Sequence, residues 1–379
     1  MSKKILIFSI GYYPFVGGAE VAIKEITDRM EDIEWHMVTC LLDRKLPRVE
    51  TIGNVKIHRL NCSKYLFPFY GFWKARSLHK KYSFDMSWAM MTFAGFAGLF
   101  FKIFFKKVPF LLSLQEGTPL SEIKKKTLFA YPLLKYQFKK ADQIQAISNF
   151  LANFAKDMGF EKDALVIPNG VTVSNFSLTI PQKDKDILMT ELGKKPEDIF
   201  LVTTSRLSHK NAVDDIIKAL KYLPENISLI IMGRGEEGCS LQKLAKDIGV
   251  SNRVKFLGLV SQTEIPAYFS ICDIFVRPSR SEGFGNSFIE AMAARLPVVA
   301  TPVGGIVDFI DDKETGIFCS VDNPRSVADA VSFILENKEI TLSMIIKAYE
   351  RVVARYDWDY LAREMKTKIF DKMLYEKNI

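Results

Sequence analysis

The 379-residue chain is long enough for two or three domains, and 48% of its residues are hydrophobic and can fill their cores. Its five cysteines are scattered and never form a CxxC spacing, and its four histidines show no metal-ligand spacing. A disulfide framework and a zinc site are therefore not expected, and reduced thiols indicate a cytoplasmic protein.

Short apolar runs alternate with longer amphipathic ones along the whole chain, which is typical of parallel α/β folds. In the first half, strands are expected at residues 4–10, 35–39, 55–60, 85–90, 109–114, 143–146 and 164–167. In the second half, they are expected at residues 199–204, 228–232, 254–257, 274–276, 297–300 and 315–319. The polar segment 172–186 lacks periodicity, so a domain boundary is expected near residue 177.

The positive charge belongs to the first half of the chain. Residues 1–177 contain 25 Lys and Arg against 15 Asp and Glu, a net charge of +10 within an overall +8. Cations alternate with aromatic residues in three segments, 64–81, 100–107 and 124–140. Such segments suit an anionic membrane surface, although solvated helix faces are an equally good interpretation. Nothing resembles a nucleic-acid-binding motif, so no nucleic acid partner is expected. The aromatic helix expected at 93–106 is too short to span a bilayer.

A glycine turn follows the first expected strand. Gly17 and Gly18 precede a helix that is expected to begin near Ala19, and Glu20 lies in its first turn. Glycines let a backbone approach a ligand closely, and the first N–H groups of a helix attract anions. The alternative interpretation is a turn that only ends the strand.

Two cations and a second glycine turn follow strands of the second half. Arg206 and Lys210 flank the turn after residues 199–204, where two positive charges can neutralise a diphosphate. The strand at 228–232 ends in a G-x-G-x-x-G run that begins at Gly233. A dinucleotide-binding fold would also need an acid at the end of the next expected strand, residues 254–257. The first acid after that strand is Glu264, which lies too far along the chain. NAD binding is therefore disfavoured.

The most informative stretch runs from residue 277 to residue 308. It contains a turn with Gly283 and Gly285, a helix expected from Asn286, and the acids Glu282 and Glu290 on either side of the turn. A glycine turn that leads into a helix N-terminus can bind phosphate through backbone N–H groups. Carboxylates beside such a site suit hydroxyl groups. The pattern therefore predicts a ligand that carries both phosphates and hydroxyls, such as a nucleotide sugar.

The run SEGFGNSFIEAMA, followed by PVVATPVGG, resembles the signature of the retaining glycosyltransferases of family 4. The resemblance implies the GT-B fold, an α/β architecture of two Rossmann-like parallel-sheet domains that face a cleft. It implies an acceptor-binding domain at 1–177, a nucleotide-sugar-binding domain at 178–355, and a C-terminal helix at 356–379 that packs back on the first domain.

The same resemblance implies roles for individual residues. Catalysis is carried over to Glu282, Arg206 and Lys210, and the acceptor side to Gln115 and Glu116. No metal and no cofactor beyond the donor are implied. The donor-binding positions are Gly17, Gly18, Arg206, Lys210, Gly233, Leu259, Val260, Glu282, Gly283, Phe284, Gly285, Asn286 and Glu290.

The sequence departs from the family pattern at three positions. Ser205 and Asn211 occupy positions where the family usually has glycine, and Gln115 stands where several relatives have histidine. An amide can hydrogen-bond a hydroxyl but cannot carry a proton, so no acid/base role is expected for Gln115.

The expected activity is transfer of a sugar from a UDP- or GDP-linked donor to a glycan or a lipid-linked acceptor, in the synthesis of envelope polysaccharides or glycolipids. The expected location is the cytoplasm, with peripheral binding to the inner face of the membrane. Two alternatives remain, namely a nucleotide-sugar epimerase on the same fold and a non-catalytic, membrane-associated nucleotide-sugar-binding protein.

Overall fold

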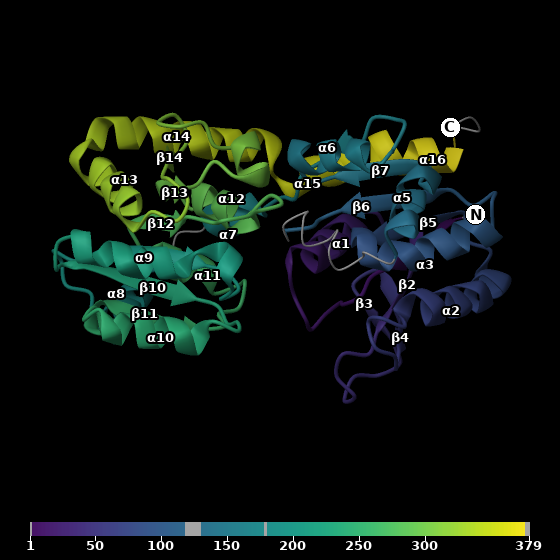
Figure 1. Cartoon of the computed structure of the whole chain (residues 1–379), viewed down its shortest axis with the longest axis horizontal. Coiled ribbons are helices and arrows are strands. Elements are labelled where there is room, and N and C mark those ends of the chain that lie inside the picture. The colour runs from purple at the N-terminus through teal and green to yellow at the C-terminus, as the bar shows by residue number, and fades with distance from the viewer. Residues whose placement is uncertain (1, 118–129, 178–179, 376–379) are drawn as a thin grey trace. The chain divides into compact units, whose positions relative to one another are not determined.

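The chain forms two compact units in the computed structural model, which describes residues 2–117, 130–177 and 180–375. Unit 1 comprises Met1–Gly170 together with Trp358–Ile379, and unit 2 comprises Val171–Asp357. Each unit is a mostly parallel sheet with helices packed on it (Figure 1). The predicted α/β class with two Rossmann-like sheets is confirmed, and unit 2 begins at residue 171 instead of the expected 178.

The sheet of unit 1 has the strand order β3-β4-β2-β1-β5-β6-β7-β8. Its central strand β1 is buried on both faces, as expected for a parallel sheet covered by helices. Ile5 and Ile7 join a cluster with α1 and α15, whereas Phe8 points the other way and contacts Phe101 of α3. The strands are β1 (Lys3–Phe8), β2 (Ile33–Cys40), β3 (Val49–Ile52), β4 (Val55–Leu60), β5 (Met86–Met90), β6 (Phe110–Leu114), β7 (Gln143–Ala146) and β8 (Leu165–Val166).

The sequence did not predict strand β3. It pairs antiparallel with β4 through a tight turn, in which Gly53 has a φ of +56°. Its side chains are exposed or half-buried, because it lies at the edge of the sheet. An edge strand needs no apolar run, so hydrophobic patterning gave no signal for it.

The helices of unit 1 include the C-terminal segment of the chain. Trp358 is 2% exposed in the core beside α1, and Arg29 Nε donates to Asp359 Oδ1 at 2.6 Å. Phe370, in a π-helical turn, lies 5.4 Å from the rings of both Trp35 and Trp88. The predicted return of the C-terminal helix to the first domain is therefore confirmed. The helices are α1 (Gly18–Asp28), α2 (Phe67–Tyr82), α3 (Met91–Phe104), α5 (Tyr131–Lys140), α6 (Asn149–Asp157), α15 (Trp358–Met365) and α16 (Asp371–Tyr375).

The sheet of unit 2 has the strand order β11-β10-β9-β12-β13-β14, and every pairing in it is parallel. The chain starts at β9, builds one side with β10 and β11, and then returns to the other side of β9 with β12. The order therefore reverses between β9 and β12. The strands are β9 (Ile199–Thr204), β10 (Ile227–Met232), β11 (Val254–Gly258), β12 (Ile274–Arg277), β13 (Val298–Ala300) and β14 (Ile317–Phe318).

Helices also occupy much of the polar segment 172–186, where a domain boundary was expected. Helices α7 (Val173–Ser177) and α8 (Gln182–Glu191) lie within or overlap residues 172–186. No residue of α8 is buried, so its sequence lacks the apolar stripe that would have revealed it. The other helices of unit 2 are α9 (Val213–Ala219), α10 (Gly238–Asp247), α11 (Ile265–Phe269), α12 (Asn286–Ala293), α13 (Pro324–Glu336) and α14 (Lys338–Arg355).

Two predictions fall partly outside the described residues. The basic segment 124–140 is described only from residue 130, and the helix expected to reach residue 377 is described to Tyr375. Among the described helices, none combines the length and the apolarity that crossing a bilayer requires.

Candidate active site

The reversal of strand order in unit 2 brings two charged loops together. The loop after β9 carries Arg206 and Lys210, and the loop after β12 carries Glu282. Strands β9 and β12 are parallel neighbours, so both loops leave the same edge of the sheet. The loops after β10 and β11, which contain Gly233 and Leu259, open at this edge as well. In open α/β sheets, ligands bind at the carboxyl ends of the strands where the order reverses.

A buried ion pair lies at the centre of this edge. Glu282 is 7% exposed, and its Oε2 accepts a hydrogen bond from Arg277 Nη2 at 2.6 Å. The same guanidinium donates to Ser287 Oγ at 2.7 Å and to Asn211 Oδ1 at 2.9 Å. Arg277 therefore joins the end of β12, the first turn of α12 and the turn after β9. These charge-assisted bonds hold the Glu282 carboxylate in one orientation.

Asn211 has a structural role that explains one departure from the family pattern. Its side chain is 1% exposed, and its Nδ2 donates to the backbone oxygen of Arg206 while its Oδ1 accepts from Arg277. The amide thus links the loop after β9 to the buried guanidinium, which a glycine could not do. The resemblance gave no reason to expect this bridge.

Lys210 lies among the charged groups of this edge. Burial lowers the pKa of its ammonium, the Glu282 carboxylate opposes that shift, and Arg277 and Arg206 add to it. Three cations therefore act on one another beside a single buried carboxylate. Such an excess of positive charge suits a doubly charged diphosphate.

Arg206 is placed differently from the other two cations. Its side chain is 73% exposed, and it forms an ion pair with Glu236, with Nη2 and Oε2 3.2 Å apart. Exposed pairs of this kind contribute little to stability and exchange partners easily. A phosphate could therefore replace Glu236 as the partner of Arg206.

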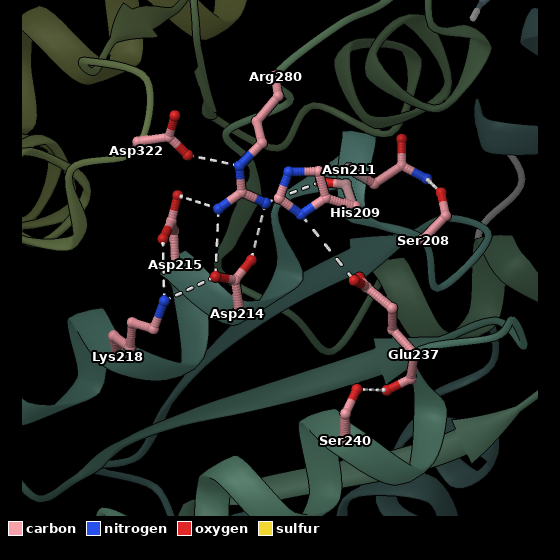
Figure 2. A network of polar contacts seen from close by, with 10 residues as sticks. All are labelled: Ser208, His209, Asn211, Asp214, Asp215, Lys218, Glu237, Ser240, Arg280 and Asp322. Atoms are coloured by element: carbon pink, nitrogen blue, oxygen red, sulfur yellow. Dashed lines mark hydrogen bonds and ion pairs between the residues drawn. The ribbon is translucent and has the colours of Figure 1, made fainter.

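A second arginine of the β12 loop, Arg280, is bonded to the turn that contains His209 (Figure 2). The backbone N–H of Arg280 donates to the carbonyl oxygen of Lys210 at 2.7 Å, and its Nη1 donates to the carbonyl oxygen of His209, also at 2.7 Å. The guanidinium also bonds Asp214 and Asp215 of α9 and Asp322. Burial would raise the pKa of Asp214, but hydrogen bonds from Arg280 and Lys218 outweigh it and lower the pKa to about 2. The two loops are thus held together by backbone and side-chain bonds.

The glycine turns shape the backbone around Glu282. Gly285 precedes α12 with a φ of +100°, and a Cβ there would lie 2.6 Å from the ring of Phe288. Gly304 has a φ of +56°, and a Cβ there would lie 1.8 Å from the carbonyl oxygen of Glu282. Only glycine fits either position, because both the conformation and the space exclude a side chain. No side chain caps the N-terminus of α12, so its N–H groups suit an anion.

Glu290 lies one turn into α12 and is half-buried. Burial raises its pKa to about 7, and the positive charge of Arg277 opposes this shift. Near neutral pH the carboxyl group is therefore present in both protonation states. It can donate a hydrogen bond as well as accept one, which suits a pair of ribose hydroxyls.

The remaining donor positions of unit 2 are of two kinds. The ring of Phe284 is 1% exposed and packs against Phe309 and Tyr356, so its side chain belongs to the core and only its backbone could meet a ligand. Leu259, in contrast, is 72% exposed beyond β11, and Val260 beside it is half-buried. Gly283 is buried and Asn286 is half-buried in the turn that enters α12.

The carboxyl edge of unit 1 carries the predicted acceptor-side residues. The side-chain amides of Gln115 and Asn169 exchange two hydrogen bonds, at 3.1 and 2.9 Å. Glu116 is 4% exposed, burial raises its pKa, and its Oε1 accepts from the backbone N–H of Thr92 at 2.6 Å. Gln115 is therefore paired with another side chain and Glu116 supports the backbone at Thr92, and the sequence predicted neither contact.

The glycine turn of unit 1 forms as expected. Gly17 is the residue before α1, and its N–H donates to the carboxylate of Glu20 at 2.9 Å. Burial raises the pKa of Glu20, and the backbone hydrogen bonds oppose the shift. The carboxylate thus occupies the helix N-terminus beside Gly18 that was predicted to meet a diphosphate.

Two family models match the chain, one in each unit. The model described as Glycosyltransferase Family 4 matches residues 16–175, and the model described as Glycosyl transferases group 1 matches residues 184–351. The chain belongs to the family 4 glycosyltransferases. The predicted resemblance is therefore confirmed.

Individual relatives support this assignment over different lengths of the chain. An uncharacterized glycosyltransferase of Methanocaldococcus jannaschii is 27% identical over 98% of both chains. A GDP-mannose-dependent alpha-(1-6)-phosphatidylinositol monomannoside mannosyltransferase of Mycobacterium tuberculosis is 30% identical over 59% of this chain and 60% of that protein. Two further curated relatives are spanned over only 53% and 64% of their lengths.

Similarity to a solved structure confirms the predicted GT-B fold of this chain. The structure of HepE from Anabaena in complex with UDP and glucose has a TM-score of 0.82, with 20% sequence identity, over 97% of this chain and all of that one. At this identity the likeness concerns the fold. The predicted arrangement of two Rossmann-like domains is thereby supported over nearly the whole chain.

The structure adds site residues that the sequence did not single out. Arg277, Ser287 and Arg280 take part in the charged network, but only Glu282, Lys210 and Arg206 were predicted there. The signal for Arg277 was its position as the last residue of β12. Among the described residues, no cluster of three or more histidine, cysteine or acidic side chains could hold a metal.

Proposed function

We propose that this protein is a retaining hexosyltransferase that transfers a sugar from a UDP- or GDP-linked donor to a glycan or a lipid-linked acceptor. One observation carries the proposal: the cations and acids of unit 2 gather at the point where the strand order reverses, around the buried Arg277–Glu282 pair. The family and the UDP complex of HepE support it.

The donor diphosphate would lie against Lys210, Arg206 and the uncapped N-terminus of α12. The phosphate contacts strengthen as the glycosidic bond breaks, because the leaving diphosphate gains negative charge. Interactions of this kind stabilise the transition state more than the ground state. Leaving-group stabilisation is then the main catalytic contribution, with no cofactor, no obligatory metal and no covalent intermediate.

The acids would hold the hydroxyl groups of the donor. Glu290 would bind the ribose, since its pKa of about 7 lets it both donate and accept hydrogen bonds. Glu282, fixed by Arg277, would bind hydroxyls of the transferred sugar and hold it over the diphosphate. The base would lie near Gly233, Leu259 and Val260, where an exposed apolar side chain is available for contact.

The acceptor would bind to unit 1 near Gln115 and Glu116. A lipid-linked or envelope glycan fits the names of several relatives, which act on a phosphatidylinositol mannoside and on an undecaprenol-linked sugar. We therefore also propose a peripheral location on the inner face of the membrane.

Two measurements test this proposal. In a thermal-shift screen with UDP, GDP and ADP, one diphosphate should raise the melting temperature, because a ligand that binds only the folded state stabilises it. Glu282→Ala and Lys210→Ala should each lower sugar transfer on the order of a hundredfold or more. Lys221→Ala, at an exposed site on the same unit, is the matched control.

Normal transfer by both variants would show that the site assignment is wrong. Conversion of the donor sugar to an epimer in the absence of acceptor would show an epimerase instead. If no diphosphate shifts the melting temperature and no donor is turned over, the chain is not a transferase of this type.

A further inference from the structure

The face formed by α2 and α3 on unit 1 exposes large apolar side chains. Helix α2 and the turn before it contribute exposed aromatic and aliphatic residues, and the end of α3 contributes two more. We call these residues the aromatic patch. They are Tyr65 (69% exposed), Leu66 (48%), Phe69 (56%), Tyr70 (54%), Trp73 (60%), Ile103 (43%) and Phe104 (55%).

Ring contacts join the two helices into one surface. The rings of Phe69 and Phe100 lie 5.6 Å apart, and those of Phe72 and Phe104 lie 5.8 Å apart. The guanidinium of Arg76 stands over both Trp73 and Phe104, at 5.3 and 4.7 Å from the ring centroids. The helices lie side by side in Figure 1. The patch is therefore continuous and partly pre-arranged by stacking.

The surroundings of the patch are strongly positive. Residues 61–108 contain eight Lys and Arg and a single acid, Asp85, which pairs with Lys3 at 3.2 Å. Of these cations, Lys102 is compensated by Asp142 at 2.7 Å. The other seven form no ion pair with any described residue, and they are Lys64, Lys74, Arg76, Lys80, Lys81, Lys106 and Lys107.

We propose that the aromatic patch and its cations dock this protein on a bilayer that contains anionic phospholipid. Large exposed apolar side chains that gather on one face mark interaction sites. Trp and Tyr rings favour the boundary between headgroups and acyl chains, and nearby cations attract anionic headgroups. The inference rests on the peripheral location proposed above and assigns it to named residues.

The positive charge around the aromatic patch also favours an anionic bilayer over a second copy of this chain as its partner. Two such faces would bring seven uncompensated cations of each molecule together, and like charges in close contact repel. A flat bilayer with negative headgroups satisfies the cations and the rings at once.

Trp73 provides a direct reporter of docking. The other three tryptophans, Trp35, Trp88 and Trp358, are 1%, 0% and 2% exposed, so only Trp73 can respond to a surface ligand. On vesicles of phosphatidylcholine with phosphatidylglycerol, its emission should shift to shorter wavelength and brominated lipid should quench it. Trp73→Phe should abolish both signals and still bind in a sedimentation assay.

Binding itself is measured by co-sedimentation with vesicles at low and high salt. Affinity should be at least about tenfold higher for vesicles with phosphatidylglycerol than for phosphatidylcholine alone, and added salt should weaken it. The triple variant Phe69→Ser, Trp73→Ser, Phe104→Ser should lose at least about tenfold in affinity. The matched control, Leu342→Ser with Ile346→Ser, changes exposed apolar residues of α14 (60% and 47% exposed) and should bind normally.

The inference is overturned if both vesicle types bind equally, or if the triple variant binds as well as the control. It is also overturned if sedimentation velocity shows a dimer that the triple variant disrupts, because the patch would then join two copies. Release of UDP or GDP from sugar donors without vesicles is measured in parallel. Vesicle binding without donor turnover would refute the proposed function alone, and turnover without vesicle binding would refute the docking surface alone.

Discussion

The carboxyl edges of the two sheets carry different chemistry, although the same strand and helix alternation builds both. In unit 2, the edge gathers Arg206, Lys210 and Arg277 around one buried carboxylate. In unit 1, it carries a reciprocal amide pair between Gln115 and Asn169 and the acids Glu20 and Glu116, whose pKa is raised by burial. The topology thus creates a binding position twice, and the side chains decide which ligand suits each one.

The difference supports the proposed division of donor and acceptor roles between the two units. A diphosphate needs fixed positive charge, which the described residues supply at the edge of unit 2. A sugar acceptor needs hydrogen-bonding groups without strong charge, and the side-chain amides of Gln115 and Asn169 are such groups. Substitutions at each edge should therefore affect different measurements.

The largest effect is expected at the buried pair of unit 2. Arg277→Met removes the counter-charge of Glu282 and leaves a carboxylate buried without its partner, so unfolding free energy should fall by about 3–5 kcal/mol. Urea denaturation measures this loss. The double variant Arg277→Met with Glu282→Gln should regain much of the stability and remain inactive in transfer. Equal stability of the single and double variants would mean that the pair does not hold the edge together.

The second effect concerns the amide pair of unit 1. Gln115→Ala removes both hydrogen bonds to Asn169, which is 3% exposed, and should cost about 1–2 kcal/mol of stability. The affinity for UDP or GDP should stay unchanged, whereas KM for the acceptor should rise. A weaker diphosphate affinity in this variant would show that the two edges do not divide the roles as proposed.

Hydrophobic patterning was sufficient to predict most of the framework. The strand at 199–204 has the predicted bounds, because it opens with the largely buried apolar run IFLV. The strand at 143–146 also has the predicted bounds. The edge strand β3 and the exposed helix α8 were missed, because neither buries an apolar stripe. The charged residues of the site were found from glycine turns and from the family resemblance.

The sequence did not predict which side chains pair when their loops follow strands that are neighbours in the sheet but distant in the chain. Arg277 and Asn211 are 66 positions apart, and their hydrogen bond exists because β9 and β12 are neighbours. The same neighbour relation lets Arg280 bond the His209 and Lys210 carbonyls. Such contacts follow from topology, and no local pattern in either loop indicates them.

The third prediction uses the raised pKa of Glu290. The folded state favours the neutral carboxyl group of Glu290. The stability that this group contributes is fully present below its pKa in the unfolded chain, and it is lost as pH rises through about 7. Glu290→Gln stays neutral and should lack this loss. The melting temperature of the variant minus that of the wild type should therefore increase by a few degrees between pH 6 and pH 8.5. A difference that stays constant over this range would contradict the assigned pKa shift.

The smallest effect is expected at the exposed pair of unit 2, where Arg206 meets Glu236. Arg206→Ala should leave stability unchanged, since exposed pairs contribute little, but should weaken diphosphate binding about tenfold and reduce its salt dependence. Glu236→Gln should have the opposite effect on diphosphate affinity. It should tighten binding about twofold to threefold, because no carboxylate then competes with phosphate for the guanidinium. Calorimetric titration with UDP and GDP at two salt concentrations measures both. If Glu236→Gln weakens binding, the carboxylate positions Arg206 for the diphosphate instead of competing with it, and the exposed pair works in the same way as the buried one.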